Sequence, residues 1–321
     1  MKKMTQLSTV LAIGLLSACG TTAETADTPQ EVTPTVEQLS ATPSDTHATP
    51  EHAVEQIRIA FLIDDDNPDS SLVFETFRAE LETYLDIPVV TIEGATHLVG
   101  IEAMRAGNLE MMWGSPFVYL LAQGALDVER LVTTDSPNVI NKTVFITAND
   151  AIQSMDDLAG HTFAFASAGS TSGFLYPMYH LINMTGYTQE QLLTGSFFSA
   201  ASFSGGQTPS MMGVLYGDFD AAAVGHIQFN NALNSGVIPA DTVRVLDSTE
   251  LIPFPGYIAT SALPRELLDR IQAFLIAYDN DFYFDTRFGD TDVRFEAPDQ
   301  AQIDYLTSMV QTLGIDLETA N

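Results

Sequence analysis

Apolar side chains recur along this chain in two alternating periods, and this alternation most narrows the folds that the chain can adopt. Residues 57–63 are apolar at every second position, as in a half-buried strand, and a polar break follows at 64–68. Residues 72–84 then carry apolar side chains three and four positions apart, as one face of a helix does. Strands that alternate with helices are typical of α/β folds with largely parallel sheets. The sequence therefore predicts an α/β fold.

The same alternation continues toward the carboxyl end and restarts after Lys142. Further strands are predicted at residues 88–92, 109–113, 162–166, 220–224 and 243–246. Further helices are predicted at residues 98–105, 171–184, 264–278 and 299–313. A chain of 321 residues, 45% of them hydrophobic, can bury the cores of two medium domains. We therefore expect two α/β lobes joined by two chain crossings, the first made of residues 57–148 plus 249–321 and the second of residues 149–248.

The amino-terminal residues resemble the signal of a bacterial lipoprotein. Two lysines precede an apolar stretch at residues 7–16, which is too short to span a bilayer as a mature helix. Leu16-Ser17-Ala18-Cys19 follows at once, and this tetrapeptide resembles the lipobox of bacterial lipoproteins. The resemblance implies that residues 1–18 are a cleaved signal peptide. It also implies that a lipid on Cys19 anchors the protein outside the cytoplasm, to the cell membrane or the outer membrane. The alternative is an ordinary secretory signal with an incidental cysteine, although Cys19 is the only cysteine in the chain.

Residues 19–56 are expected to form a disordered linker that begins with the lipidated cysteine. They are rich in Thr, Ala, Pro and Glu and carry few large apolar side chains. Folding would bury too little of their surface to offset the loss of conformational entropy. No later segment is predicted to span a membrane.

The charge of the chain excludes one large class of partners. The chain carries 42 Asp+Glu against 12 Lys+Arg, a formal net charge of −30 at pH 7. Such a surface repels nucleic acid, which is itself a polyanion, so no nucleic-acid partner is expected. We expect a monomer that meets the membrane through its lipid anchor.

Three consecutive hydroxyl residues, Ser170, Thr171 and Ser172, form the main candidate site, and we call them the hydroxyl triplet. They follow an apolar strand and open a predicted helix, with Gly169 before them and Gly173 after them. Free backbone N–H groups and the positive end of the helix dipole meet at a helix start, which makes it a ready anion site. The hydroxyls add donors, and the glycines let the backbone approach a ligand closely. The alternative is a plain Ser/Thr N-cap, yet three hydroxyls are more than one cap requires.

The order of four motifs resembles the phosphonate/phosphite-binding proteins of ABC importers, which are type II periplasmic binding proteins. The motifs are the strand and loop at 59–68, Met112-Trp113-Gly114-Ser115-Pro116-Phe117-Val118-Tyr119, Gly169-Ser170-Thr171-Ser172-Gly173 and Gly217-Asp218-Phe219-Asp220-Ala221-Ala222-Ala223-Val224. The resemblance implies a small oxyanion held between two lobes by the hydroxyl triplet. It places Tyr119 as a donor from the opposite lobe and Asn67 at the lip of the cleft. It also implies ABC permease subunits as partners, and a binding protein instead of an enzyme.

Two positions depart from the family pattern. The family commonly has Ser-His after Phe-Ser-Gly, where this chain has Gly206-Gln207, and Gln207 can donate a hydrogen bond but cannot take a proton. The family often has Asp after the last motif, where this chain has Gly225 and then His226. Without that carboxylate, an aminoalkylphosphonate is less expected than a smaller or differently protonated oxyanion. Gln207 and His226 are candidate ligand contacts, although a lone histidine is more often structural. The matched motifs contain no Arg or Lys, so neutral donors are expected to hold the ligand.

No cofactor and no metal are expected. Four oxygen-bearing residues fall near the spacing of a calcium loop: Asp64, Asp66, Ser70 and Glu75. Asp69, however, stands where that loop needs glycine, and the histidines show no paired ligand spacing. Two other functions stay open, a ligand-sensing module for a membrane receptor kinase and an anchored hydrolase. The hydrolase is less favoured because a nucleophile elbow needs Ser where this chain has Thr171.

Overall fold

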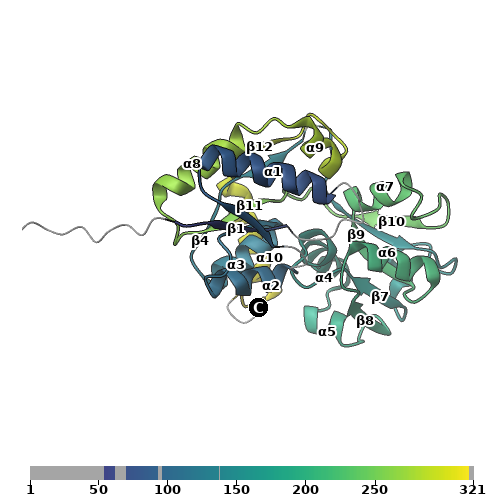
Figure 1. Ribbon diagram of the computed structural model, residues 1–321. Helices are drawn as coiled ribbons and strands as arrows, with labels where there is room; N and C mark the ends of the chain where they lie inside the picture. Colours follow the sequence, from purple (N-terminus) through teal and green to yellow (C-terminus); the bar gives the residue numbers. More distant parts are fainter. Residues whose placement is uncertain (1–53, 62–69, 93–95, 137, 318–321) are drawn as a thin grey trace, which may run out of the picture. The chain divides into compact units, whose positions relative to one another are not determined.

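The structure is a computed structural model, and it describes residues 54–61, 70–92, 96–136 and 138–317 (Figure 1). Three sequence predictions fall outside these residues: the signal peptide at 1–18, the lipidated Cys19 and the candidate ligand contact Asn67. Most of the linker predicted at 19–56 also lies outside them.

The first sheet in the described part of the chain has five strands, in the order β2-β1-β3-β11-β4. Their bounds are β1 Ile57–Ala60, β2 Val89–Ile92, β3 Met111–Gly114, β4 Val128–Arg130 and β11 Gly256–Thr260. β1 pairs in parallel with β2 and β3, whereas β11 runs antiparallel to β3 and β4. Because β11 comes from the carboxyl-terminal part of the chain, two separate stretches of sequence build this sheet.

Helices pack on both faces of the first sheet, because side chains alternate along its strands. Ile57 and Ile59 belong to one buried cluster with helices α1, α8 and α9. Ala60 and Met112 belong to another with helices α2, α3 and α10. The bounds of these helices are α1 Ser70–Leu85, α2 His97–Arg105, α3 Pro116–Ala125, α8 Arg265–Ile276, α9 Asp281–Phe288 and α10 Gln300–Leu313.

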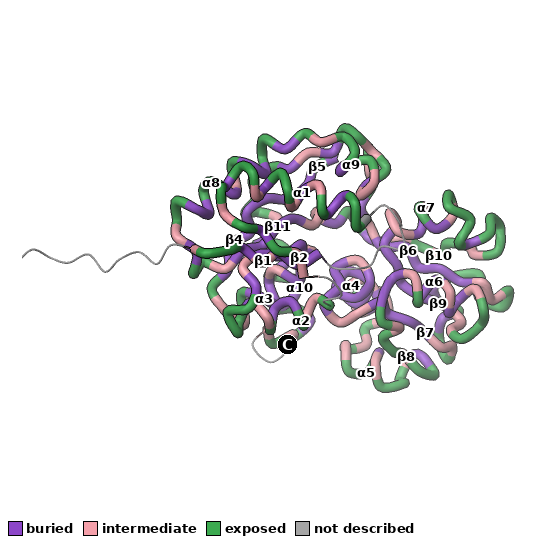
Figure 2. The backbone as a smooth tube through the Cα atoms, in the orientation of Figure 1, coloured by how far each residue is buried: buried purple, intermediate pink, exposed green. Residues whose placement is uncertain are grey.

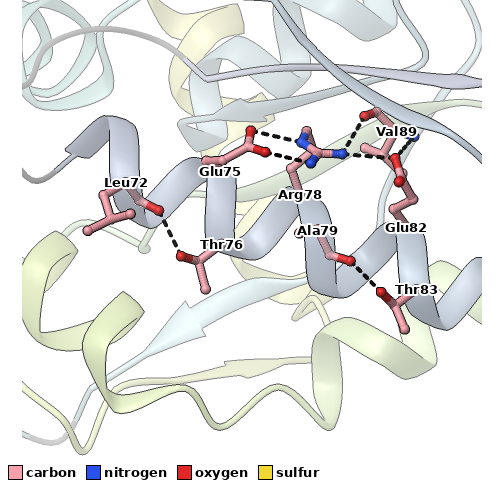
Figure 3. Close-up of polar contacts among 8 residues, drawn as sticks. All are labelled: Leu72, Glu75, Thr76, Arg78, Ala79, Glu82, Thr83 and Val89. Atoms are coloured by element: carbon pink, nitrogen blue, oxygen red, sulfur yellow. Dashed lines mark hydrogen bonds and ion pairs between the residues drawn. The ribbon is translucent and has the colours of Figure 1, made fainter.

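Polar contacts fix α1 against the edge strand β2, as Figure 3 shows. The Arg78 guanidinium donates to the carboxylates of Glu75 and Glu82, at 2.8 Å from each, and to the carbonyl oxygen of Val89 at 3.1 Å. The backbone amide of Val89 donates in turn to the Glu82 carboxylate at 2.9 Å. Ion pairs between partly exposed groups on one helix contribute only about 0.3–0.5 kcal/mol each. The contacts to the backbone of Val89 therefore matter more, because they connect the helix to the strand.

The second sheet of the described residues also has five strands, in the order β10-β6-β9-β7-β8. Their bounds are β6 Thr143–Thr147, β7 Thr162–Phe165, β8 Ala200–Phe203, β9 Ala221–Gly225 and β10 Arg244–Ser248. β7 pairs in parallel with β8 and β9, whereas β6 runs antiparallel to β9 and β10. One face packs on α6 Gln207–Tyr216 and α7 His226–Asn234, and the other on α4 Tyr176–Thr185.

Strand β6 belongs to the second sheet, whereas the sequence pattern assigns residues 143–148 to the first lobe. Its place is set by antiparallel pairing with β9 and β10, which come much later in the chain, and local periodicity carries no sign of such pairing. We therefore propose that the first chain crossing lies just before Thr143. The second crossing then follows Ser248, where β10 ends.

The remaining elements are short. They are η1 Met155–Leu158, α5 Gln189–Leu193, and the pair β5 Thr133–Asp135 and β12 Arg294–Glu296. The helix predicted at 171–184 opens as a π-helical turn, η2 Thr171–Leu175, that continues into α4. Buried residues follow the central strands of both sheets in Figure 2, whereas the edge strands β8 and β10 contain none. The predicted α/β fold is confirmed. Among the residues described, no helix has the length and apolar character that a membrane span needs.

Candidate functional site

A cavity of about 170 Å³ lies beside segments that follow β3 of the first sheet and β7 and β9 of the second. The region beyond the carboxyl ends of strands is the usual place for ligands in α/β sheets. Its lining residues are His97, Trp113, Ser115, Pro116, Asn141, Ser170, Thr171, Ser172, Gln207, Ile227, Gln228, Asn231, Ile252, Pro253, Phe254, Pro255, Arg287 and Phe288. The structure thus brings the whole hydroxyl triplet and Gln207 to one cavity.

Five helices of the described chain begin at this cavity. α2 begins at His97, α3 after its N-cap Ser115, η2 after its N-cap Ser170, α6 at Gln207 and α7 at His226. The first N–H groups of a helix have no partner within the helix, and the helix dipole places partial positive charge at the same end. Five such ends at one cavity favour an anion there.

The hydroxyl triplet is held by protein N–H groups. The Ser170 hydroxyl accepts from the amide of Gly173 at 2.9 Å, and the Thr171 hydroxyl accepts from the amide of Phe117 at 3.0 Å. The Ser172 hydroxyl accepts from the Gln207 side-chain amide at 3.2 Å. In every hydrogen bond found for these three hydroxyls among the described residues, the hydroxyl oxygen is the acceptor. Each hydroxyl can therefore still donate its proton to a further acceptor.

Gln207 orients the triplet from the start of α6. Its side-chain oxygen accepts from the amide of Gly225 at 2.9 Å, which leaves its NH₂ group to donate to Ser172 and, at 3.4 Å, to Ser170. The residue is only 5% exposed, so this orientation is fixed inside the protein. Gln207 thus ties the end of β9 to the hydroxyl triplet.

Gly173 is required by the packing of the same turn. A Cβ atom at this position would lie 2.4 Å from the Cβ of Ala166 and 2.9 Å from the Ser170 hydroxyl. The first of these atoms is fixed at the end of the buried strand segment. The glycine predicted to allow close backbone approach therefore lets the π-helical turn pack on the strand that precedes it.

Tyr119 and His226 do not line the cavity. Tyr119 lies on α3, and its phenol oxygen accepts from the side-chain amide of Gln123 at 2.8 Å. The ring nitrogen Nδ1 of His226 lies 3.1 Å from the carbonyl oxygen of Ile140 on the chain crossing. The expected donor role of Tyr119 is thus not met here, and His226 has the structural contact that a lone histidine commonly has. Ile227 and Gln228, the next two residues on α7, line the cavity.

Two basic residues of the cavity wall, Arg287 and His97, lie outside the four matched motifs. Arg287, on α9, brings a guanidinium to the cavity wall, whereas the matched motifs contain no Arg or Lys. His97, at the start of α2, is partly buried, and burial lowers its pKa to about 4, so its ring is neutral at pH 7. Among the described residues, no Asp or Glu lines the cavity. The part of the wall that the structure describes is thus free of carboxylates, although the whole chain has a formal net charge of −30.

The chain matches one protein family over most of its length. The model of a family described as ABC transporter, phosphonate, periplasmic substrate-binding protein matches residues 49–303. The phosphate-import protein PhnD of Mycolicibacterium smegmatis is 25% identical over 231 residues, which cover 70% of this chain and 72% of that protein. A probable ABC transporter phosphite binding protein, PhnD1 of Prochlorococcus marinus, is 28% identical over 173 residues, which cover 50% of this chain and 55% of that protein.

Solved structures agree with the architecture. PhnD1 of Prochlorococcus marinus in complex with methylphosphonate has a TM-score of 0.70 at 20% identity, and the match covers 81% of this chain and 98% of that one. A binding protein component of an ABC phosphonate transporter from Pseudomonas aeruginosa has a TM-score of 0.69 at 15% identity, with 83% and 89% covered. These likenesses confirm the predicted two-lobed fold of periplasmic binding proteins. Since the family model covers more than half of the sequence, the chain belongs to the periplasmic substrate-binding proteins of phosphonate ABC transporters, which bind a solute outside the cytoplasm and are not enzymes.

Proposed function

We propose that this protein is a lipid-anchored binding protein that captures a phosphorus oxyanion, such as a phosphonate or phosphite, for an ABC importer. The observation that carries the proposal is the hydroxyl triplet: all three hydroxyls accept from protein N–H groups and keep their protons for a ligand. They do so at a cavity that five helix starts border and from whose described wall carboxylates are absent.

The strength of such a site follows from the number of donors. A hydrogen bond to a charged group contributes about 1.5–3 kcal/mol, and a tetrahedral oxyanion can accept five or six of them. After the costs of desolvation and ordering, the remainder corresponds to a micromolar dissociation constant or lower. Carboxylates on the distant surface weaken the binding of an anion only slightly, since two charges 20 Å apart in water interact by only about 0.2 kcal/mol before screening.

The named relatives favour phosphorus oxyanions as a class without selecting one. The Mycolicibacterium relative is named for phosphate import, the Prochlorococcus relative for phosphite binding, and the latter's structure contains methylphosphonate. All three anions present tetrahedral oxygens that hydroxyls and helix amides can bind. We therefore assign the class and leave the choice within it to titration.

We also propose that the site works by closure of two lobes. The first would comprise residues 57–142 and 249–317 and the second residues 143–248, which are the stretches that contribute to the two sheets. A ligand that contacts Ser115 of the first and the hydroxyl triplet of the second would favour the closed arrangement. The closed form is the one that a permease would recognise.

The membrane anchor is a separate part of the proposal. Cys19 follows the lipobox-like residues directly, and a diacylated cysteine holds a protein to a membrane stably. Growth of the bacterial cell with a radiolabelled fatty acid should label the natural protein but not a Cys19→Ala variant. Equal release of both proteins into the soluble extracytoplasmic fraction would refute the anchor.

The single tryptophan of the chain provides the test of ligand binding. Trp113 lines the cavity, so a bound ligand should change its fluorescence. We expect saturable changes on titration with phosphite, methylphosphonate or phosphate and none with sulfate at equal ionic strength, with calorimetry giving the same dissociation constants. Calorimetry that detects no binding of any phosphorus oxyanion would refute the proposal.

A further inference from the structure

The carbonyl oxygen of Ser172 accepts a hydrogen bond from outside its own helix. In the π-helical turn η2, the amide of Tyr176 donates to the carbonyl oxygen of Thr171, five residues earlier. The next bond of this kind would join Pro177 to Ser172, but proline has no N–H group. The hydroxyl of Thr143, at the start of β6, donates to this oxygen at 2.6 Å. Thr143 thus completes the turn that carries the hydroxyl triplet.

Thr143 is itself fixed in the interior of the protein, where it is 0% exposed. Its amide donates to the hydroxyl of Thr249 at 3.0 Å, and its carbonyl oxygen accepts from the amide of Thr249 at 3.0 Å. Strand β6 begins at Thr143, and Thr249 directly follows the last residue of β10. The two residues therefore join the two proposed chain crossings, and the hydroxyl that binds Ser172 belongs to this junction.

A second support reaches Ser172 through its side chain. Thr143 stands opposite Gly225 where β6 pairs with β9. The amide of Gly225 donates to the side-chain oxygen of Gln207 at 2.9 Å, and the side-chain amide of Gln207 donates to the Ser172 hydroxyl at 3.2 Å. Ser172 is thus held at two points, its carbonyl oxygen by Thr143 and its hydroxyl by Gln207.

This double support matters because a hydrogen bond depends on geometry. A hydroxyl binds an anionic oxygen well only within a narrow range of distance and angle. A donor that the protein already holds in place loses no freedom when the ligand arrives, so less of the binding free energy is spent on ordering. Ser172 lines the cavity and Thr143 does not, so any effect of Thr143 on a ligand must pass through Ser172.

We propose that Thr143 is a positioning residue for ligand binding. Its hydroxyl holds the backbone of Ser172, and thereby keeps the Ser172 hydroxyl where an oxyanion can accept its proton. This inference rests on the proposed function, and it adds to that site a residue of β6 that does not touch the ligand.

The test is the replacement of Thr143 by valine, which has nearly the same shape and no hydroxyl. Calorimetry of the whole protein with phosphite, methylphosphonate and phosphate gives the dissociation constants. For each of these anions that the natural protein binds, we expect Kd to rise about tenfold in Thr143→Val. Thr143→Ser keeps the hydroxyl and should restore Kd to within about threefold of the natural value.

Thr147→Val is the matched control. Thr147 lies at the other end of β6, is also 0% exposed, and donates through its hydroxyl to the carbonyl oxygen of Asp220 at 2.6 Å. That hydroxyl also accepts from the amide of Asn149 at 3.0 Å, and Thr147 does not line the cavity. Thr147→Val should therefore lower the melting temperature at least as much as Thr143→Val, yet change Kd by less than about twofold.

A double-mutant cycle with Ser172→Ala separates positioning from a general loss of structure. In the Ser172→Ala protein the hydroxyl that Thr143 positions is gone. Thr143→Val should then change Kd by less than about threefold, instead of about tenfold in the natural background. If the valine variant does not fold, Thr143→Ala and Thr143→Ser are compared in its place, in both backgrounds.

Three results would overturn the inference alone: an unchanged Kd in Thr143→Val, an equal loss of binding in Thr147→Val, or the same loss in both backgrounds of the cycle. In each case the natural protein still binds an oxyanion, so the proposed function stands. If the natural protein binds none of the three anions, the proposed function fails and this inference fails with it.

Discussion

The hydroxyl of Thr171 accepts a hydrogen bond from the backbone amide of Phe117 at 3.0 Å, and this bond joins the start of η2 to the start of α3. The two residues follow strands of different sheets, β7 and β3. Thr171 is only 3% exposed, so the bond is shielded from water. One side chain therefore holds the two halves of the site together and still has a proton to donate to a ligand.

Replacement of Thr171 by valine should weaken both ligand binding and the fold. Valine has nearly the same shape but neither donates nor accepts, so the ligand loses a hydrogen bond worth about 1.5–3 kcal/mol, and Kd rises about tenfold to a hundredfold. The buried amide of Phe117 also loses its acceptor, which costs about 1–3 kcal/mol of stability. Calorimetry and urea unfolding measure the two effects.

Thr171→Ser is the control for this change, because serine keeps the hydroxyl and loses one methyl group. Its Kd should stay within about threefold of the natural value. If Thr171→Val binds phosphite or methylphosphonate as tightly as the natural protein, Thr171 is not part of the ligand site.

Gln207→Glu should abolish most binding at pH 7 with little change of volume. A carboxylate still accepts from Gly225 but cannot donate to Ser172 or Ser170, and it places a negative charge beside the bound anion. We expect Kd to rise more than about a hundredfold. Protonation of the new carboxyl at lower pH should restore part of the affinity, and unchanged binding at pH 7 would show that Gln207 does not face the ligand.

Gly173→Ala should damage the site through packing. The added Cβ would meet the fixed Cβ of Ala166 at 2.4 Å and the Ser170 hydroxyl at 2.9 Å, so the turn must move. We expect a loss of about 1–3 kcal/mol in the free energy of unfolding together with weaker binding. Gly225→Ala is the comparison, since its closest contact is the mobile end of Gln228 at 2.2 Å.

In this comparison Gly225→Ala should lose less stability than Gly173→Ala in the same urea titration. Equal losses would mean that flexible and fixed neighbours cost the same here, and the packing argument for Gly173 would fail.

His97 should make the ligand-free protein less stable as pH falls from about 6.5 to about 4. The folded protein keeps this ring neutral down to pH about 4, because burial lowers the pKa of His97, whereas the unfolded chain binds the proton near pH 6.5. In this window the unfolded state holds more protons, so acid favours unfolding. Since the ring is partly exposed, we expect about 1–2 kcal/mol from this residue.

Urea unfolding at pH 7 and pH 5 measures the effect, and His97→Gln provides the reference. The natural protein should lose more stability between the two pH values than the variant does. An identical loss in both proteins would show that the titration of His97 is not linked to folding.

Tyr119→Phe tests the one predicted donor that the structure places elsewhere. The phenol oxygen accepts from Gln123 on the same helix and lies outside the cavity wall. Removal of the hydroxyl should change the Kd for methylphosphonate by less than about twofold. A tenfold loss would mean that the ligand-bound protein brings Tyr119 to the site.

Sequence patterns could predict those parts of the site that depend on neighbouring residues. The apolar strand before Gly169 and the hydroxyl triplet after it specify a strand, a turn and a helix start, and all three occur in the structure. Gln207 became a candidate only through the family resemblance, because it stands where the family commonly has His. The spacing of apolar residues alone predicted the first strand and the helix at 72–84.

The other parts of the site depend on contacts between residues far apart in the sequence, and the spacing of apolar residues does not predict such contacts. Arg287 reaches the cavity because α9 packs on α1, which places the guanidinium over Phe74. His226 is the first residue of α7, and successive side chains on a helix point about 100° apart. This rotation directs His226 to Ile140 and its two neighbours to the cavity.

A crystal structure of the protein grown with methylphosphonate tests the central claim most directly. We expect the phosphonate group in the cavity, with its oxygens within about 3 Å of the side-chain oxygens of Thr171 and Ser172. Density for the ligand at any other place, with these hydroxyls facing only protein or water, would contradict it.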